Sequence, residues 1–221
     1  MKKILALTAA LFMSLTLSAA NSWAQGLLGN RYLSVSFGNL FPGNDQLREI
    51  DDSVAQIGLD FNFPVTKNID IFAAAGYSKL KGSLPGDFLE STSETARFDA
   101  GVAYQFFPGQ AFNPFVRGRV GYVNVDAVNN SDGQGTTGLP VGGGNEGDVS
   151  YGVGGGIEVP FAGQFAASTG FDYKKAGDVD DFIGFVNMTG WFNKVLFAGL
   201  GFSYGLDQGD FSYNTSIGFG F

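Results

Sequence analysis

The side chains of this chain that could do chemistry are carboxylates and guanidinium groups. The 221 residues include no histidine and no cysteine, which excludes mechanisms based on imidazole or thiolate groups. Carboxylates alone can act as acid and base when their surroundings separate their pKa values. Adjacent acids occur at Asp51-Asp52 and Asp180-Asp181, but loop-like flanking sequence favours a hydrated anionic surface there. We therefore expect no enzymatic activity, no cofactor and no metal centre.

A second set of charges occupies alternating positions within otherwise apolar segments. Seven residues share this placement: Asp60, Arg97, Asp99, Arg117, Arg119, Glu158 and Asp172. Because unpaired charges in a narrow interior are costly, we expect these residues to pair with one another or to meet water. Two interpretations stay open, namely a salt-bridge network that fills the interior and the lining of a gated or narrow ion path.

Most acids lie between the apolar segments. The chain carries 21 Asp and Glu against 13 Lys and Arg, and this acidic balance argues against nucleic acid as a partner. Sixteen of the acids lie in or beside predicted external loops: Asp45, Glu49, Asp51, Asp52, Asp87, Glu90, Glu94, Asp126, Asp132, Glu146, Asp148, Asp178, Asp180, Asp181, Asp207 and Asp210. Two roles stay open for these acids. They could form a hydrated rim whose like charges repel one another, or they could bind divalent cations that bridge to lipopolysaccharide phosphates.

The elements that must position the interior charges are β-strands, because apolar residues recur at every second position. In 53–63, for example, Ile57, Leu59 and Phe61 share one face. No run of 18 apolar residues follows Leu17, so a helical membrane span is excluded there. Ten alternating segments follow one another: 31–39, 53–63, 69–79, 94–106, 114–124, 149–160, 165–174, 181–192, 195–205 and 210–221.

The connections between these segments alternate in length. Those after the second, fourth, sixth and eighth segments are short, whereas long ones cover 40–52, 80–93 and 125–148. Short turns at one rim and long loops at the other predict an all-β fold, a closed antiparallel up-and-down transmembrane β-barrel of ten strands. Eight strands is the alternative, in which two segments between 181 and 221 would be loop. The segment 181–192 alternates least regularly.

Glycine indicates which face is turned outward, because solvent-exposed strands disfavour it and a crowded barrel interior accepts it. Eleven glycines share the non-apolar face: Gly58, Gly76, Gly101, Gly121, Gly152, Gly154, Gly156, Gly199, Gly201, Gly218 and Gly220. On the apolar face, tyrosines lie near the long-loop strand ends and phenylalanines near the opposite ends, as two membrane interfaces require. The pattern favours a membrane barrel over a soluble barrel of the lipocalin type.

Residues 1–24 predict a cleaved secretory signal peptide. Lys2 and Lys3 precede an apolar stretch over 4–17, and Ser22 and Ala24 place small side chains at the −3 and −1 positions of a cleavage site. A membrane-anchoring helix is the alternative, but the small residues at its end favour cleavage after Ala24. The barrel domain then covers 25–221, and 11 basic against 21 acidic residues give it a net charge of −10, since Lys2 and Lys3 are removed.

The C-terminal segment ends on Phe221, with aromatic and aliphatic residues at alternate positions before it: Phe211, Tyr213, Ile217 and Phe219. With NPFVRGRVGY and YGVGGGIEV, it resembles the small outer-membrane β-barrel proteins related to the OmpA transmembrane domain, OmpX and the Opa-type opacity proteins. In that family such a terminus is the signal read by the outer-membrane assembly machinery. Two features depart from the family: ten strands exceed its usual eight, and no peptidoglycan-binding domain follows.

The resemblance covers the mature chain and implies an outer-membrane location, but no activity. Outer-membrane barrel enzymes such as the omptin proteases use histidine, which this chain lacks. Two function classes remain, a structural or surface-interaction protein of the envelope and a narrow, low-conductance porin-like channel. We expect a monomer whose partners are outer-membrane lipids, lipopolysaccharide and the assembly machinery.

Deleting Phe221, or replacing it by Asp, should prevent assembly, because the aromatic terminus matches the family's assembly signal. Cell fractionation at native expression should find the variant in the periplasm and degraded. Normal outer-membrane levels of either variant would contradict this role for Phe221.

Overall fold

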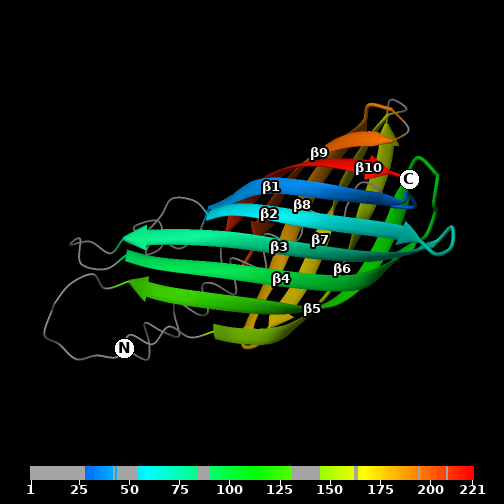
Figure 1. Cartoon of the computed structure of the whole chain (residues 1–221). Coiled ribbons are helices and arrows are strands. Elements are labelled where there is room, and N and C mark those ends of the chain that lie inside the picture. Colours follow the sequence, from blue (N-terminus) through cyan, green and yellow to red (C-terminus); the bar gives the residue numbers. More distant parts are fainter. Residues whose placement is uncertain are drawn as a thin grey trace, which may run out of the picture.

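The computed structural model describes residues 28–41, 43, 54–83, 90–130, 145–161, 164–193, 195–207 and 209–221. They form ten strands: β1 (Tyr32–Phe41), β2 (Val54–Pro64), β3 (Ile69–Ser83), β4 (Glu90–Gln105), β5 (Asn113–Asn130), β6 (Asn145–Phe161), β7 (Phe165–Ala176), β8 (Val179–Trp191), β9 (Leu196–Gly205) and β10 (Phe211–Gly220). Each strand pairs antiparallel with its chain neighbours, and β1 pairs with β10, so the sheet closes into a barrel (Figure 1). The ten-strand prediction is confirmed and the eight-strand alternative is wrong. None of the described residues forms a helix that is apolar and long enough to cross a membrane.

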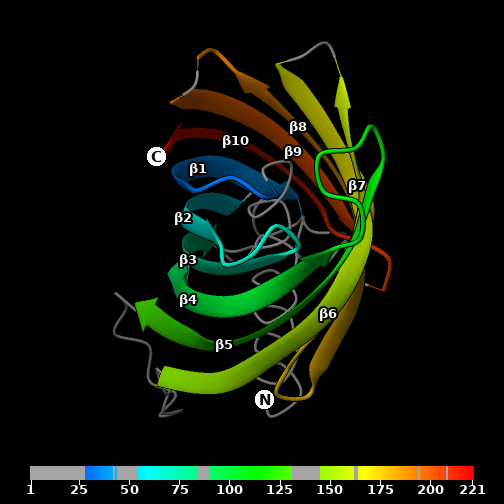
Figure 2. The same cartoon turned by 90° about the vertical axis from the view of Figure 1, so that its right-hand side faces the viewer.

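The barrel is taller on one side than on the other. β3, β4, β5 and β6 contain 15, 16, 18 and 17 residues, whereas β1, β9 and β10 contain 10 each. In Figure 1, β3, β4 and β5 extend beyond β1 and β2 at the end opposite the C-terminus. Figure 2 shows β1 to β4 on one side of the barrel and β6 and β7 on the other. The short turn between β2 and β3 lies at the C-terminal end (Figure 1) and is closed by the Thr66 hydroxyl, which accepts the Asn68 and Ile69 N–H groups. We call this end the short-turn end and the other the long-loop end.

Buried and exposed positions alternate along the strands, as the pleat requires. In β2, Gln56 and Asp60 are 7% and 1% exposed, whereas Ile57 and Leu59 are 42% and 50% exposed. The apolar face therefore points away from the lumen and the polar face points into it. This is the arrangement of strands that contact hydrocarbon on one side only.

Apolar and polar residues alternate poorly over 181–192 in the sequence, because β8 carries apolar side chains on both of its faces. Its inward face carries Ile183 and Phe185, which are buried, while Phe182 and Val186 face outward. The Phe185 ring lies against β7, where a Cβ on Gly170 would approach Cζ of that ring to 2.6 Å. Apolar side chains on β8 thus enter the lumen where a neighbouring glycine leaves room.

Aromatic side chains fill the lumen at the short-turn end. Tyr32 and Phe197 are each 1% exposed, their rings meet edge to face with centroids 5.5 Å apart, and Trp191 lies 4.9 Å from Phe197. A Cβ on Gly220 would lie 3.0 Å from the Trp191 ring, and one on Gly218 would collide with Phe197. The inward glycines of β10 therefore make room for the rings of β8 and β9.

Two acids that the sequence places at the edges of external loops, as the first residues of the segments 181–192 and 210–221, point into the barrel. Asp181 belongs to β8, opposite Lys174 of β7, and is fully buried, and Asp210 directly before β10 is buried as well. The run Asp178–Asp181 looks like loop sequence because it is rich in charge. The alternation nevertheless continues through it, and this places Asp181 on the inward face.

Proteinase K added to whole cells should cut within 126–148. The fold places the start of that connection at the long-loop end, and its sequence is rich in glycine and poor in apolar residues, which favours cleavage. Lys67, in the short turn at the other end, should be protected. Cleavage at Lys67 in intact cells with 126–148 untouched, read by mass spectrometry of the fragments, would mean that the orientation is inverted.

Candidate functional site: the charged lumen

Arg117 and Arg119 of β5 and Asp172 of β7 form the centre of the lumen. Arg117 donates from Nε to Oδ1 of Asp172 at 2.9 Å and from a terminal nitrogen to Oδ2, so this ion pair is bidentate. Arg119 donates to the same Oδ2 at 3.0 Å. The guanidinium of Arg117 also lies 5.2 Å from the centre of the Phe185 ring. One buried carboxylate therefore holds two cations from another strand, and charge-assisted bidentate contacts are strong when they are buried.

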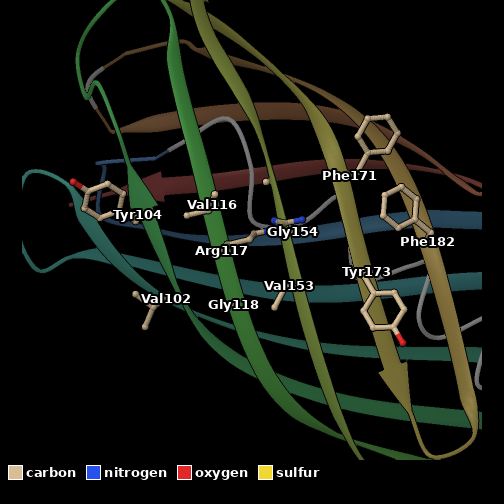
Figure 3. Close-up of a pocket in the computed structure, with 11 residues that line it drawn as sticks. Val102, Tyr104, Val116, Arg117, Gly118, Val153, Gly154, Phe171, Tyr173 and Phe182 are labelled. Atoms are coloured by element: carbon tan, nitrogen blue, oxygen red, sulfur yellow. The ribbon is translucent and has the colours of Figure 1, made fainter.

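Glycines of β6 make this pairing possible, because β6 lies between β5 and β7. Gly154 is the register partner of both Arg117 and Asp172, and Gly152 is the partner of both Arg119 and Lys174. A Cβ on Gly154 would collide with the Asp172 carboxylate, and one on Gly152 would lie 3.0 Å from Nε of Arg119. Figure 3 shows the Arg117 side chain reaching to Gly154. Because Gly152 and Gly154 have no side chains, the arginine side chains of β5 can cross β6 and reach β7.

A second ion pair joins Arg97 and Asp99 on β4, and both side chains are buried. Lys174 of β7 is 1% exposed and interacts electrostatically with Arg119, Arg97, Asp99 and Asp172, which links the two groups. Lys174 was not among the predicted inward charges, although its position two residues after Asp172 places it on the same inward face. This lumen cluster, Arg97, Asp99, Arg117, Arg119, Asp172 and Lys174, thus combines four cations with two carboxylates.

Asp60 and Glu158, two of the seven predicted inward charges, lie outside the lumen cluster. Within the described part of the chain neither forms an ion pair with an arginine. Asp60 on β2 is buried and faces Ser34 of β1 in the register. Glu158 accepts a hydrogen bond from the backbone N–H of Leu28. The sequence shows that these side chains point inward, but it does not show which strand they face across the lumen.

Asp70 organises the short-turn mouth of the barrel. Its Oδ2 accepts hydrogen bonds from the Gly29 N–H at 2.7 Å and from the side-chain amides of Gln105 at 3.1 Å and Asn62 at 3.3 Å. Asn62 also donates to the Asn30 carbonyl at 2.8 Å. The Asp70, Gln105 and Asn62 side chains are buried, so the backbone of Leu28–Asn30, which we call the N-terminal strap, is held inside the mouth. Asp70 was not predicted from the sequence, and only its inward position one residue into β3 could have pointed to it.

The long-loop end of the lumen is acidic as well. Asp210 accepts the Gly43 N–H at 2.8 Å, and burial raises the pKa of Asp210 while this hydrogen bond opposes the rise. Asp181 lies nearby and is buried too. In the described ranges no three acids are grouped so that they could hold a metal ion.

The residues of the predicted assembly signal lie on the outer face of β10 and just after it. Phe211, Ile217, Phe219 and Phe221 are exposed to the membrane side, and Tyr213 is partly exposed. Phe221 follows the last strand, and its N–H donates to the Arg31 carbonyl at the junction with β1. Their role in assembly stays a prediction.

A closed antiparallel barrel with an apolar outer face and a charged lumen defines an integral membrane β-barrel. The family model of the outer membrane protein beta-barrel domain matches residues 7–187, so the chain belongs to this family, and the match supports a location in the outer membrane. A search of curated proteins gave no match.

Solved structures of other proteins resemble this chain at low identity. The transport unit of the autotransporter AIDA-I from Escherichia coli is 12% identical, with a TM-score of 0.51 over 96% of this chain and 97% of that chain. Ail, the attachment invasion locus protein of Yersinia pestis, is 10% identical with a TM-score of 0.43 over 87% and 97%. The N-terminal β-barrel domain of Pseudomonas aeruginosa OprF is 16% identical with a TM-score of 0.37 over 89% and 100%.

Replacing Asp172 by Asn should destabilise the barrel by on the order of 3 kcal/mol, because it leaves two buried guanidinium groups without their carboxylate. Urea unfolding of the protein refolded in lipid vesicles measures the difference. Asp180→Asn is the matched control, because this exposed acid on the next strand accepts the Tyr173 hydroxyl at the surface, and the change should alter stability little. Equal stability of the Asp172→Asn and Asp180→Asn variants would contradict the conclusion that Asp172 stabilises the barrel.

Proposed function

We propose that this protein is a closed outer-membrane barrel with a structural or surface-interaction role in the cell envelope. One observation carries the proposal: the lumen is crossed by the buried contact of Arg117 and Arg119 with Asp172. A barrel of ten strands is close to the size at which side chains just fill the interior, and an open channel needs many more strands. The interior side chains therefore decide whether the barrel conducts.

The order of charges along the lumen supports a closed interior. The lumen cluster carries an excess of cations, whereas the buried acids Asp70 and Glu158 lie toward the short-turn end and bind the N-terminal strap. An ion of either sign that moves along the axis meets charge of its own sign. It would also have to separate buried ion pairs, which is costly.

A narrow, low-conductance channel is the second candidate, and one wall of the barrel favours it. The inward positions of β9, β10 and β1 are mostly small and polar: Gly199, Gly201, Ser203, Ser212, Asn214, Ser216, Ser34 and Ser36. Small hydroxylated side chains leave room for water along this wall. A path there would pass beside the lumen cluster and would give a small current.

The remaining expectations follow from the membrane location. We propose that the signal peptide is removed after Ala24, that the barrel works as a monomer, and that it contacts outer-membrane lipids, lipopolysaccharide and the assembly machinery. The lack of histidine and cysteine supports a role without catalysis.

The double variant Arg117→Ala, Arg119→Ala should conduct where the native protein gives small currents or none. Removing both guanidinium groups opens space beside Gly152 and Gly154 and leaves Asp172 unpaired, so the new current should prefer cations. Single-channel recording of the refolded proteins in planar bilayers measures it.

Lys175→Ala is the matched control, because this lysine lies on the outer face of β7 and should leave the native behaviour unchanged. Equal conductance in the native protein and the double variant would mean that these arginines do not close the lumen.

A further inference from the structure

Two buried acids at the long-loop end repel each other. Asp181 points inward from β8 and is fully buried, and Asp210, directly before β10, is 2% exposed. Asp210 and Asp207 both repel Asp181, and each repulsion is larger than the attraction of Asp181 to Lys174. Lys174 also interacts with the carboxylates of the lumen cluster. Buried like charges are costly unless a cation compensates them, so this pair needs more positive charge than the described chain supplies.

Gly205 of β9 lies between the two acids, as a glycine of β6 lies between Arg117 and Asp172. A Cβ on Gly205 would approach Oδ2 of Asp181 to 2.7 Å, so the Asp181 carboxylate lies against the bare backbone of β9. On the other side, the Gly205 N–H donates to the Asp210 carbonyl at 2.8 Å. In the lumen cluster this arrangement joins a cation to an acid, whereas here both members are acids.

The carboxylates of this pair have oxygen atoms without partners in the described chain. Both oxygens of Asp181 and Oδ2 of Asp210 are buried and form no hydrogen bond there. The backbone N–H of Asp207 acts on Asp181 from the connection between β9 and β10, but it does not form a hydrogen bond of normal geometry. Oδ1 of Asp210 is the exception, because it accepts the Gly43 N–H. Three buried oxygen atoms are therefore left for a cation.

We propose that Asp181 and Asp210 bind one calcium ion inside the long-loop mouth of the barrel. Ca²⁺ takes about six to eight oxygen ligands, which include carboxylates, backbone carbonyls and water. Two carboxylates can supply the charge, while backbone oxygens and water complete the shell. Since no three acids of the described ranges are grouped to hold a metal ion, the affinity should be low, with a Kd on the order of 10⁻⁴ to 10⁻³ M.

The sequence predicted no metal centre, because acids between strands look like a hydrated surface. Asp181 and Asp210 differ from such acids, since both are buried. A bound ion would join β8 to the start of β10. Through the Gly43 N–H on Asp210, it would also hold the connection that follows β1. The site concerns the long-loop mouth and does not depend on whether the lumen conducts.

Thermal unfolding of the full-length protein, refolded in detergent without lipopolysaccharide, tests this site in EDTA and in about 10 mM calcium chloride. Calcium should raise the Tm of the wild type by roughly 3–10 °C. Asp181→Asn and Asp210→Asn each remove one of the two charged ligands, so this rise should be lost or fall severalfold. In EDTA both variants should melt no lower than the wild type, because each removes one of two buried like charges. A merely structural role would not give this combination.

Asp180→Asn is the matched control. It removes the same charge from the neighbouring position of β8, where the side chain is exposed and accepts the Tyr173 hydroxyl. This variant should keep the calcium response of the wild type. An equal response in Asp180→Asn, Asp181→Asn and Asp210→Asn would overturn the proposal in favour of calcium on exposed acids.

Two further results would overturn the site. One is a wild type whose Tm does not respond to calcium, and the other is a response that arises only after lipopolysaccharide is added, which would indicate cations that bridge to its phosphates. If the Asn variants fail to fold, Gly205→Ala tests the same site from β9, because its Cβ would displace the Asp181 carboxylate. A reduced calcium response in Gly205→Ala supports the site, and an unchanged response contradicts it.

Discussion

Charge inside a narrow barrel has to find partners within the barrel, and the Asp172 carboxylate is the shared partner of two arginines. Its carboxylate accepts from Arg117 and Arg119 across β6, which is possible only because Gly154 leaves that strand without a side chain between them. The contact ties β5 to β7 and places the Arg117 guanidinium beside the Phe185 ring. Removing any of these parts would leave a buried charge or an unfilled space.

The two faces of the sheet use glycine for different reasons. Inside, glycine makes room for a large neighbour, as Gly154 does for Asp172, Gly170 for Phe185 and Gly218 for Phe197. Outside, Gly118 makes room for nothing that belongs to the described chain. The inward glycines therefore allow large side chains to fill the lumen, which concerns stability and closure. The N-terminal strap adds a further closure at the short-turn mouth through Asp70 and Glu158.

The sequence predicted the strands and the direction of their side chains, because a period of two residues is explicit in the order of residue types. It did not predict which side chains meet, because partners depend on the register and on distances around the barrel. The seven inward charges were expected to pair with one another without assigned partners, and the structure pairs Arg117 with Asp172. Lys174 and Asp70 were missed although the alternation places both on the inward face. Asp181 was expected at the edge of an external loop because its neighbours are charged, whereas β8 begins two residues earlier, at Val179, and Asp181 is buried.

The contact between Arg117 and Asp172 can be measured directly by a double-mutant cycle. Urea unfolding in lipid vesicles would compare the wild type, Arg117→Met, Asp172→Asn and the double variant. A buried, bidentate pair predicts a coupling free energy of about 2–3 kcal/mol between the two side chains. Additive effects, with a coupling below about 0.5 kcal/mol, would contradict the view that this ion pair holds the lumen together.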